Sequence, residues 1–246
     1  MKCWWCGDDA DSREHKYKKT DLTREFGKGP YLGTSSLVRV FKGRQYPIHG
    51  PDSKQAKFQP SLCAACNNIK SQPFDMAYDE FCLYIKENEI SIIEIKQIMF
   101  KNVFNLRWKI KIADLIRYYV KHICCRLAER NIPIESDVID YLNGSNRLKH
   151  FRMNLEIRDD IVALLRKTGI GYIAIGDLMC LISKSTGSIS NINSHFTYRW
   201  LRLNYEYDLN IGKLKTNFSK NIVHLNSGFS VDPEKVIAYN AESLDS

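Results

Sequence analysis

The chain contains no run of about 18 consecutive apolar residues, the minimum for a membrane-spanning helix. Its first residues are polar and include cysteine, with no apolar segment of the kind found in secretory signal peptides. Internal repeats and low-complexity tracts are also missing. We therefore expect no membrane span, a cytoplasmic location, and a chain folded as one large domain or two modest ones.

Acidic residues are fewer than basic ones, with 28 Asp and Glu against 36 Lys and Arg, which gives a formal net charge of +8. A positive charge of this size permits attraction to a polyanion but does not require it. Attraction to a polyanion is favoured where basic residues cluster, and they cluster directly after His15. The candidates for contacts with nucleic acid are Lys16, Lys18, Lys19 and Arg24.

Two tight cysteine pairs, Cys3-x-x-Cys6 and Cys63-x-x-Cys66, account for half of the eight cysteines. In a chain without a secretory segment, this spacing favours a metal site in a reducing compartment over disulfides. Four thiolates complete the tetrahedral coordination of a structural zinc ion. Buried thiols or a redox Cys-x-x-Cys motif are the alternatives. The remaining cysteines lie in apolar stretches and are expected to be small core residues: Cys82, Cys124, Cys125 and Cys180.

Residues of another ligand type lie near these pairs. Glu14 and His15 lie between them, and Asn67 directly follows the last cysteine. Carboxylate and amide oxygens suit a hard divalent ion such as Mg²⁺, and an imidazole with a pKa of about 6.5 can accept a proton at neutral pH. This combination predicts a second, catalytic metal site. The simpler interpretations are a surface salt bridge between Glu14 and His15 and a helix N-cap role for Asn67.

Residues 1–86 are predicted to form one module. Glu14 and His15 are expected on a short strand or its edge, and Asp21 begins a short helical turn. A strand is expected over 36–41, with a hairpin turn at 42–44. The second cysteine pair leads into an amphipathic helix that begins near Asp75. Trp4 and Trp5 are expected in the core of the module rather than stacked on bases.

Residues 87–232 are predicted to form a second domain of helices and antiparallel strands, with a role that the composition does not reveal. Apolar spacings of three and four predict a helix over 112–131, and a second helix is expected over 135–142. A strand over 151–157, a helix over 159–167 and several antiparallel strands over 169–209 follow. Residues 233–246 are a polar tail.

Taken together, Cys3-x-x-Cys6, Glu14-His15 and Cys63-x-x-Cys66-Asn67-Asn68 resemble the HNH endonucleases, also called the His-Me finger or ββα-metal group. The match is to the branch in which two cysteine pairs hold zinc and an asparagine follows the last cysteine. The resemblance covers roughly the first 85 residues. It implies an α+β protein with a zinc-stapled, treble-clef-like ββα-metal module at the N-terminus, followed by the helical and antiparallel-β domain.

The resemblance also implies an activity, the metal-dependent hydrolysis of phosphodiester bonds in nucleic acid, with DNA as the expected substrate. It makes His15 the base that activates water, and Glu14 and Asn67 the ligands of Mg²⁺ or another divalent ion. Cys3, Cys6, Cys63 and Cys66 hold the structural zinc. A role in phage defence or in a mobile element follows from the resemblance alone.

The chain departs from the family pattern at two positions. Many members have a second histidine after the last cysteine, where this chain has Asn67-Asn68, and an asparagine before the second pair, which is missing between His15 and Cys63. His49 and Asp21 are the candidates to compensate. Two alternatives therefore stay open: a zinc-dependent nucleic-acid-binding protein without catalysis, and a partner-dependent nuclease subunit or toxin that acts on RNA. The 87–232 domain is the candidate surface for a protein partner.

Overall fold

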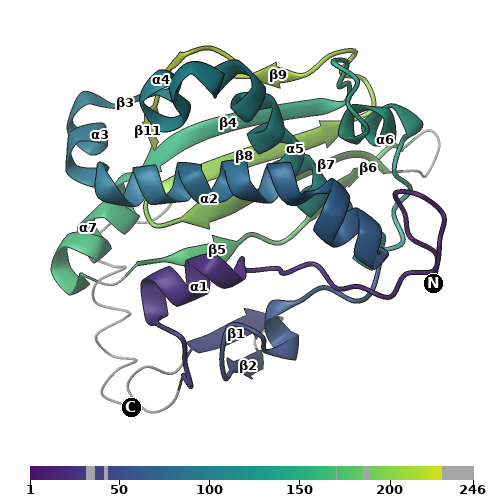
Figure 1. Cartoon of the computed structure of the whole chain (residues 1–246), viewed down its shortest axis with the longest axis horizontal. Coiled ribbons are helices and arrows are strands. Elements are labelled where there is room, and N and C mark those ends of the chain that lie inside the picture. Colours follow the sequence, from purple (N-terminus) through teal and green to yellow (C-terminus); the bar gives the residue numbers. More distant parts are fainter. Residues whose placement is uncertain (32–36, 42–43, 170, 185–188, 229–246) are drawn as a thin grey trace. The chain divides into compact units, whose positions relative to one another are not determined.

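The computed structural model in Figure 1 describes residues 1–31, 37–41, 44–169, 171–184 and 189–228. The chain forms two compact units: the first comprises Met1–Leu83 and Val103–Leu148, and the second comprises Tyr84–Asn102 and Lys149–Ser246. The protein is mixed α+β, as expected. Residues 42–43 of the expected hairpin turn and the polar tail over 233–246 lie outside the described residues.

The two units are not contiguous in sequence, unlike the domains over 1–86 and 87–232 that the sequence suggested. The first break after Leu83 is close to the expected boundary, but Val103–Leu148 returns to the first unit. Val103–Leu148 belongs to the first unit because it contains helix α5 (Trp108–Glu129), which buries side chains on most of its circumference. A helix buried on so many sides needs partners on each of them, and a change in composition along the chain does not reveal which segments supply those partners.

The first unit also contains short elements that present the candidate site. Its further helices and strands are α1 (Lys19–Phe26), β1 (Leu37–Phe41), β2 (Arg44–Ile48), a 3-10 helix (Lys54–Ala56), a π-helix (Ala65–Lys70), the start of α2 (Gln72–Glu87), a second 3-10 helix (Asn105–Arg107) and α6 (Ser136–Leu142). β1 and β2 pair antiparallel, from Leu37 opposite Ile48 to Phe41 opposite Arg44, in agreement with the expected hairpin.

Helix α2 follows the apolar spacing that predicted it, since Ala77, Tyr78, Phe81 and Cys82 are all buried. It begins three residues before Asp75, and the π-helix precedes it, so helical structure starts within the second cysteine pair. Asn67 therefore lies inside a helix. The N-cap interpretation of Asn67 is wrong, because an N-cap residue has non-helical backbone angles and precedes the first turn.

The second unit is built on a seven-stranded sheet with the order β11-β4-β8-β7-β5, in which β6 also pairs with β7 and β9 with β4. The strands are β4 (Phe151–Arg158), β5 (Ile173–Ile175), β6 (Met179–Ile182), β7 (Ile189–Tyr198), β8 (Leu201–Asp208), β9 (Lys215–Thr216) and β11 (Asn226–Gly228). β5, β6 and β8 all pair antiparallel with β7, which confirms the antiparallel strands expected over 169–209. β9 and β11 pair parallel with β4, which no local pattern predicted.

Three helices and a short two-stranded sheet complete the described part of this unit: α3 (Glu89–Ile95), α4 (Phe100–Phe104, which continues into the first unit), α7 (Asp159–Thr168), and β3 (Gln97–Met99) paired with β10 (Ile222–His224). Strand β8 alternates buried and half-buried residues, as a strand with one face in the core should. All four residues of β6 are exposed, and the expectation that Cys180 is a core residue is wrong. Apolar composition alone does not separate a short exposed strand from a buried one.

Candidate functional site

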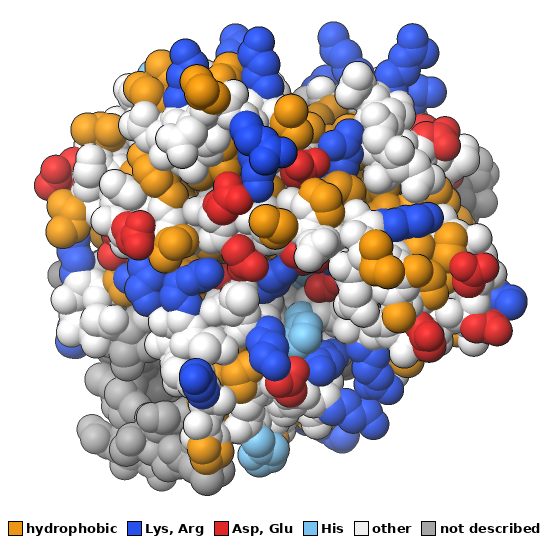
Figure 2. Space-filling view, viewed as in Figure 1, with side chains coloured by type: hydrophobic (Ala, Val, Ile, Leu, Met, Phe, Trp, Pro, Cys, Tyr) orange, Lys and Arg blue, Asp and Glu red, His pale blue; other side chains and the backbone are white. Residues whose placement is uncertain are grey.

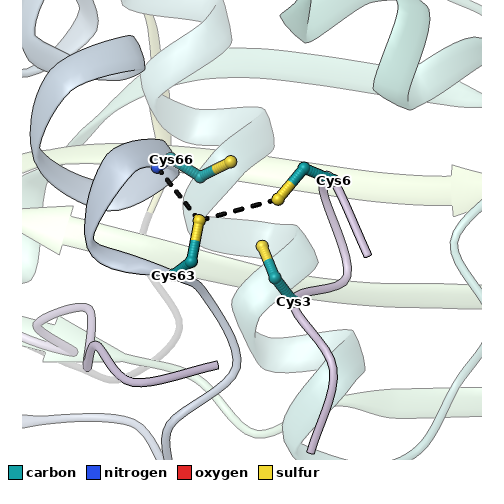
Figure 3. Close-up of side chains that lie close together, drawn as sticks. All are labelled: Cys3, Cys6, Cys63 and Cys66. Carbon is teal, nitrogen blue, oxygen red and sulfur yellow. Dashed lines mark hydrogen bonds between the residues drawn. The ribbon is translucent and has the colours of Figure 1, made fainter. Parts of the chain in front are cut away.

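The four cysteines of the two pairs converge in the first unit. Their sulfur atoms all lie within 4.8 Å of one another, and Cys6 Sγ is 3.6 Å from Cys63 Sγ. Figure 3 shows the four side chains directed toward a common point. Zinc bonded tetrahedrally to sulfur at about 2.3 Å places the sulfurs roughly 3.8 Å apart. The donor set and its spacing therefore fit a metal ion such as zinc.

Local backbone geometry prepares the cysteines for this role. The Gly7 amide donates to the Cys3 carbonyl at 2.9 Å, and Gly7 adopts a φ of 85° that favours glycine. The Cys66 amide donates to Cys63 Sγ at 3.4 Å. Burial raises the pKa of the Cys66 thiol, so a thiolate at this position needs a compensating cation.

The two tryptophans beside the first pair differ in burial. Trp5 is buried, stacks against Phe74 with ring centroids 6.2 Å apart, and donates Nε1–H to Asn143 Oδ1 at 2.9 Å. Trp4 is half-buried and stacks against Trp5. The expectation of a core role is confirmed for Trp5, and Trp4 covers it from one side.

A cavity of about 720 Å³ lies beside the cysteine cluster and is lined by the other predicted site residues. Glu14, His15 and Asn67 all line it, although Asn67 is 52 positions from His15 in the chain. The remaining lining residues are Ser12, Arg13, Lys18, Lys19, Thr20, Thr23, Arg24, Lys57, Asn68 and Asp75. The three predicted catalytic residues thus line one cavity, and their roles stay predictions.

The strand edge expected at Glu14 and His15 is present as an isolated antiparallel bridge between His15 and Lys57. The Phe58 amide donates to the Glu14 carbonyl at 2.9 Å and extends this pairing. Asn67 comes from the π-helix, a rare conformation that is frequently found at functional sites. An extended segment therefore carries Glu14 and His15, and a helix that begins within the second cysteine pair carries Asn67.

Two residues that line this cavity each have a buried polar side-chain atom without a hydrogen-bond partner among the described residues: His15 Nε2 and Asn67 Oδ1. The Asn67 amide nitrogen donates to Ser12 Oγ at 2.9 Å, which leaves its oxygen as the free acceptor. The nearest carboxylate oxygen to His15 Nε2, Asp52 Oδ1, is 3.8 Å away and too distant for a hydrogen bond. Buried polar atoms without partners are costly, and a ligand in the cavity would satisfy them.

The electrostatic environment keeps the His15 imidazole neutral. Burial lowers the pKa of His15 below its ordinary value, and the Glu14 carboxylate opposes this shift only in part. A neutral imidazole with a free ring nitrogen can accept a proton at pH 7.

Glu14 is buried and its carboxylate has two partners. Oε1 accepts the His15 amide at 3.1 Å, and Oε2 lies 2.5 Å from Lys121 Nζ. The simpler interpretation of Glu14 as part of a surface salt bridge with His15 is wrong, because its partner is a buried lysine. Lys121 also contacts Ser71 Oγ at 3.1 Å and Asp75 Oδ2 at 3.4 Å. Burial alone would lower the pKa of Lys121, but the carboxylates of Glu14 and Asp75 outweigh it and raise the pKa.

Sequence reasoning missed Lys121 and the role of Asp75 in this network. Lys121 lies on α5, in a stretch whose apolar spacing points only to a core helix. Asp75 was identified as a residue near the start of a helix, yet its carboxylate is paired with Lys18 and Lys121. The one sequence signal for Lys121 is a lysine within the apolar stretch of a predicted helix.

The four basic residues predicted to contact nucleic acid are all engaged in ion pairs within the chain. Lys16 is buried, pairs with Glu129 at 2.7 Å and does not line the cavity. The other three line it: Lys18 pairs with Asp75, Lys19 with Asp52 at 2.5 Å, and Arg24 with Asp21 at 2.7 Å. Figure 2 accordingly shows charged side chains of both signs over the region of α1.

The two residues considered as substitutes for the missing histidine do not line the cavity. His49 is exposed. Asp21 is fully buried and accepts hydrogen bonds from Tyr78 Oη at 2.6 Å and from Arg24. Burial raises the pKa of Asp21 to about 7. Asp21 therefore belongs to the packing between α1 and α2.

No family model matches the chain, and no curated protein or solved structure matches it either. None of the helices in the described part of the chain is both long and apolar enough to cross a membrane.

Proposed function

We propose that the protein is a metal-dependent endonuclease of the HNH type, which hydrolyses phosphodiester bonds in nucleic acid, with DNA as the expected substrate. The cysteine cluster and the segments around it form its treble-clef-like ββα-metal module. The observation that carries the proposal is a pair of buried polar atoms, His15 Nε2 and Asn67 Oδ1, that have no hydrogen-bond partner in the described part of the chain. Both residues line the cavity that Glu14 also lines.

The residues divide into a base and a set of oxygen ligands. His15, which lines the cavity, would take the proton of the attacking water. The side-chain oxygens of Glu14 and Asn67 would hold Mg²⁺ or a similar ion, because hard cations prefer oxygen ligands. When bound, such an ion supplies a Lewis acid for the negative charge that develops on the phosphate and on the leaving oxygen. Cys3, Cys6, Cys63 and Cys66 would hold zinc as a structural cross-link outside the reaction.

Lys18, Lys19 and Arg24 would contact the phosphates of the substrate. Each already pairs with a carboxylate, so a phosphate must compete with a partner in the chain. The Lys19–Asp52 pair is exposed, and exposed ion pairs contribute little free energy, so exchange at Lys19 is feasible at low cost. The pairs of Lys18 and Arg24 are largely buried and cost more to exchange. Affinity for nucleic acid should therefore fall steeply as the salt concentration rises.

A nicking assay on supercoiled plasmid, with a panel of Mg²⁺, Mn²⁺ and Ni²⁺, tests this function. Wild type should nick the plasmid only with a divalent ion, and Asn67→Ala should reduce the rate while the zinc content stays unchanged. A single-stranded RNA in parallel reactions distinguishes the two nucleic acids. Tight binding without cleavage under every metal would reject the nuclease and favour the alternative of a non-catalytic binding protein.

A further inference from the structure

Lys121 connects the candidate metal site to a helix far along the chain. Its side chain is fully buried on α5, and Nζ lies 2.5 Å from Glu14 Oε2 and 3.4 Å from Asp75 Oδ2. None of the motifs that suggested the site includes α5. A buried lysine is costly unless its charge is paired, and here two carboxylates pair with it. The location of this charge, directly against Glu14, has a consequence for metal binding.

The contacts of Glu14 restrict how its carboxylate can bind an ion. Oε2 is committed to Lys121. Among the residues that the structure describes, Oε1 accepts one hydrogen bond, from the backbone amide of His15, so it keeps a lone pair for another partner. Glu14 can therefore offer one oxygen. Mg²⁺ and Mn²⁺ are satisfied by single carboxylate oxygens and water, whereas Ca²⁺ takes more ligands and often binds both oxygens of one carboxylate.

We propose that Lys121 is a positioning residue that holds Glu14 to single-oxygen coordination and thereby favours Mg²⁺ or Mn²⁺ over Ca²⁺. This inference rests on the proposed function, in which Glu14 and Asn67 hold a divalent ion. The ammonium group has a second effect, because its positive charge beside the ligands weakens the binding of any cation. Lys121 thus sets both the selectivity and the strength of the site.

The test measures binding of Mn²⁺ and of Ca²⁺ to the full-length, zinc-loaded chain by isothermal titration calorimetry. Wild type should bind Mn²⁺ more tightly than Ca²⁺. Lys121→Met removes the charge and frees Glu14 Oε2, so both affinities should rise by about tenfold or more, with the larger gain for Ca²⁺. Lys111→Met is the matched control, because Lys111 lies on the same helix and pairs with Glu80 at 2.6 Å outside the cavity. It should bind both ions as wild type does.

Lys121→Gln is the second variant, for use if circular dichroism shows that Lys121→Met does not fold. Glutamine keeps an N–H donor for Glu14 Oε2 and loses only the charge, so both affinities should rise together with their ratio unchanged. An unchanged Mn²⁺ to Ca²⁺ ratio in folded Lys121→Met, or unchanged affinities in Lys121→Gln, would overturn the proposal. If neither ion binds wild type or any variant, the metal site of the proposed function is itself rejected, which is a different result.

Discussion

Lys121 Nζ and Glu14 Oε2 lie 2.5 Å apart, and this buried ion pair joins helix α5 to the segment that carries His15. Both side chains are almost completely shielded from solvent. The pair makes α5 part of the site although α5 is distant in sequence. The stability of the first unit and the geometry of the candidate site therefore depend on the same contact.

Lys121→Met should lower the free energy of unfolding by about 3–5 kcal/mol, because it leaves the Glu14 carboxylate buried without a counter-charge. Denaturant unfolding in the absence of added Mg²⁺ measures this change. Lys111→Met removes a lysine from the same helix whose partner Glu80 is half-exposed, and it should cost only about 1 kcal/mol. Equal losses of unfolding free energy in the two variants would show that the buried Lys121–Glu14 pair stabilises the protein no more than the Lys111–Glu80 pair does.

Cys63→Ser should reduce the zinc content below that of wild type and lower the melting temperature of the chain, since it removes one of four converging sulfurs. Metal analysis by mass spectrometry and thermal unfolding by circular dichroism provide the two readouts. Cys180→Ser is the matched control, because Cys180 is exposed on β6 and lies outside the cluster. Full zinc content in Cys63→Ser would contradict the proposal that the four cysteines bind zinc.

His122 should make the protein less stable in acid. Its Nε2–H donates to the Lys16 carbonyl at 3.0 Å, and burial, with the positive charges of Arg126, Lys121 and Lys16 nearby, lowers its pKa to about 3. The folded state thus keeps this imidazole neutral, and the unfolded chain protonates it near its ordinary value. The stabilisation is complete above a pH of about 6.5 and is lost as the pH falls toward 3, by up to about 1.4 kcal/mol per pH unit.

Denaturant unfolding at several pH values between 7 and 4 tests this prediction on wild type and His122→Gln. Glutamine retains an N–H donor for the Lys16 carbonyl but does not titrate in this range. The variant should therefore show a flatter dependence of the free energy of unfolding on pH. Parallel curves for the two proteins would mean that His122 is not the group responsible.

Asp21 should give the opposite dependence at higher pH. Its folded-state pKa of about 7 lies above the ordinary value of 3.8, so the folded state binds a proton that the unfolded chain has released. This contribution is complete below a pH of about 4 and is lost as the pH rises through 7. Asp21→Asn should abolish this slope, and its nicking activity should remain, since Asp21 does not line the cavity. Chemical unfolding at pH 5 and pH 8 compares the two proteins directly.

The residues that mark the site could be found from sequence because their spacing is local. Two Cys-x-x-Cys pairs dictate where two segments meet, and Glu14-His15 and Asn67 follow from their positions beside those pairs. Helix α5 could also be predicted from sequence, because apolar residues at intervals of three and four indicate a helix with a buried face.

The ion-pair partners and the parallel strand pairings could not be predicted, because they depend on contacts between segments that are distant in sequence. Nothing near Lys18 in sequence identifies Asp75 as its partner, and nothing near Glu14 identifies Lys121. For the same reason, the basic residues after His15 looked like free cations although each has a carboxylate partner. The parallel pairing of β9 and β11 with β4 was hidden as well, because strands of two and three residues carry too little pattern.

The most direct test of the central claim is the rate of Mg²⁺-dependent plasmid nicking by His15→Ala. His49→Ala serves as the matched control, because His49 is exposed and lies outside the cavity. Loss of a general base should reduce the rate by roughly 10²- to 10⁴-fold in His15→Ala and leave His49→Ala at the wild-type rate. Equal nicking by wild type and a folded, zinc-loaded His15→Ala would contradict the account and remove His15 from the reaction.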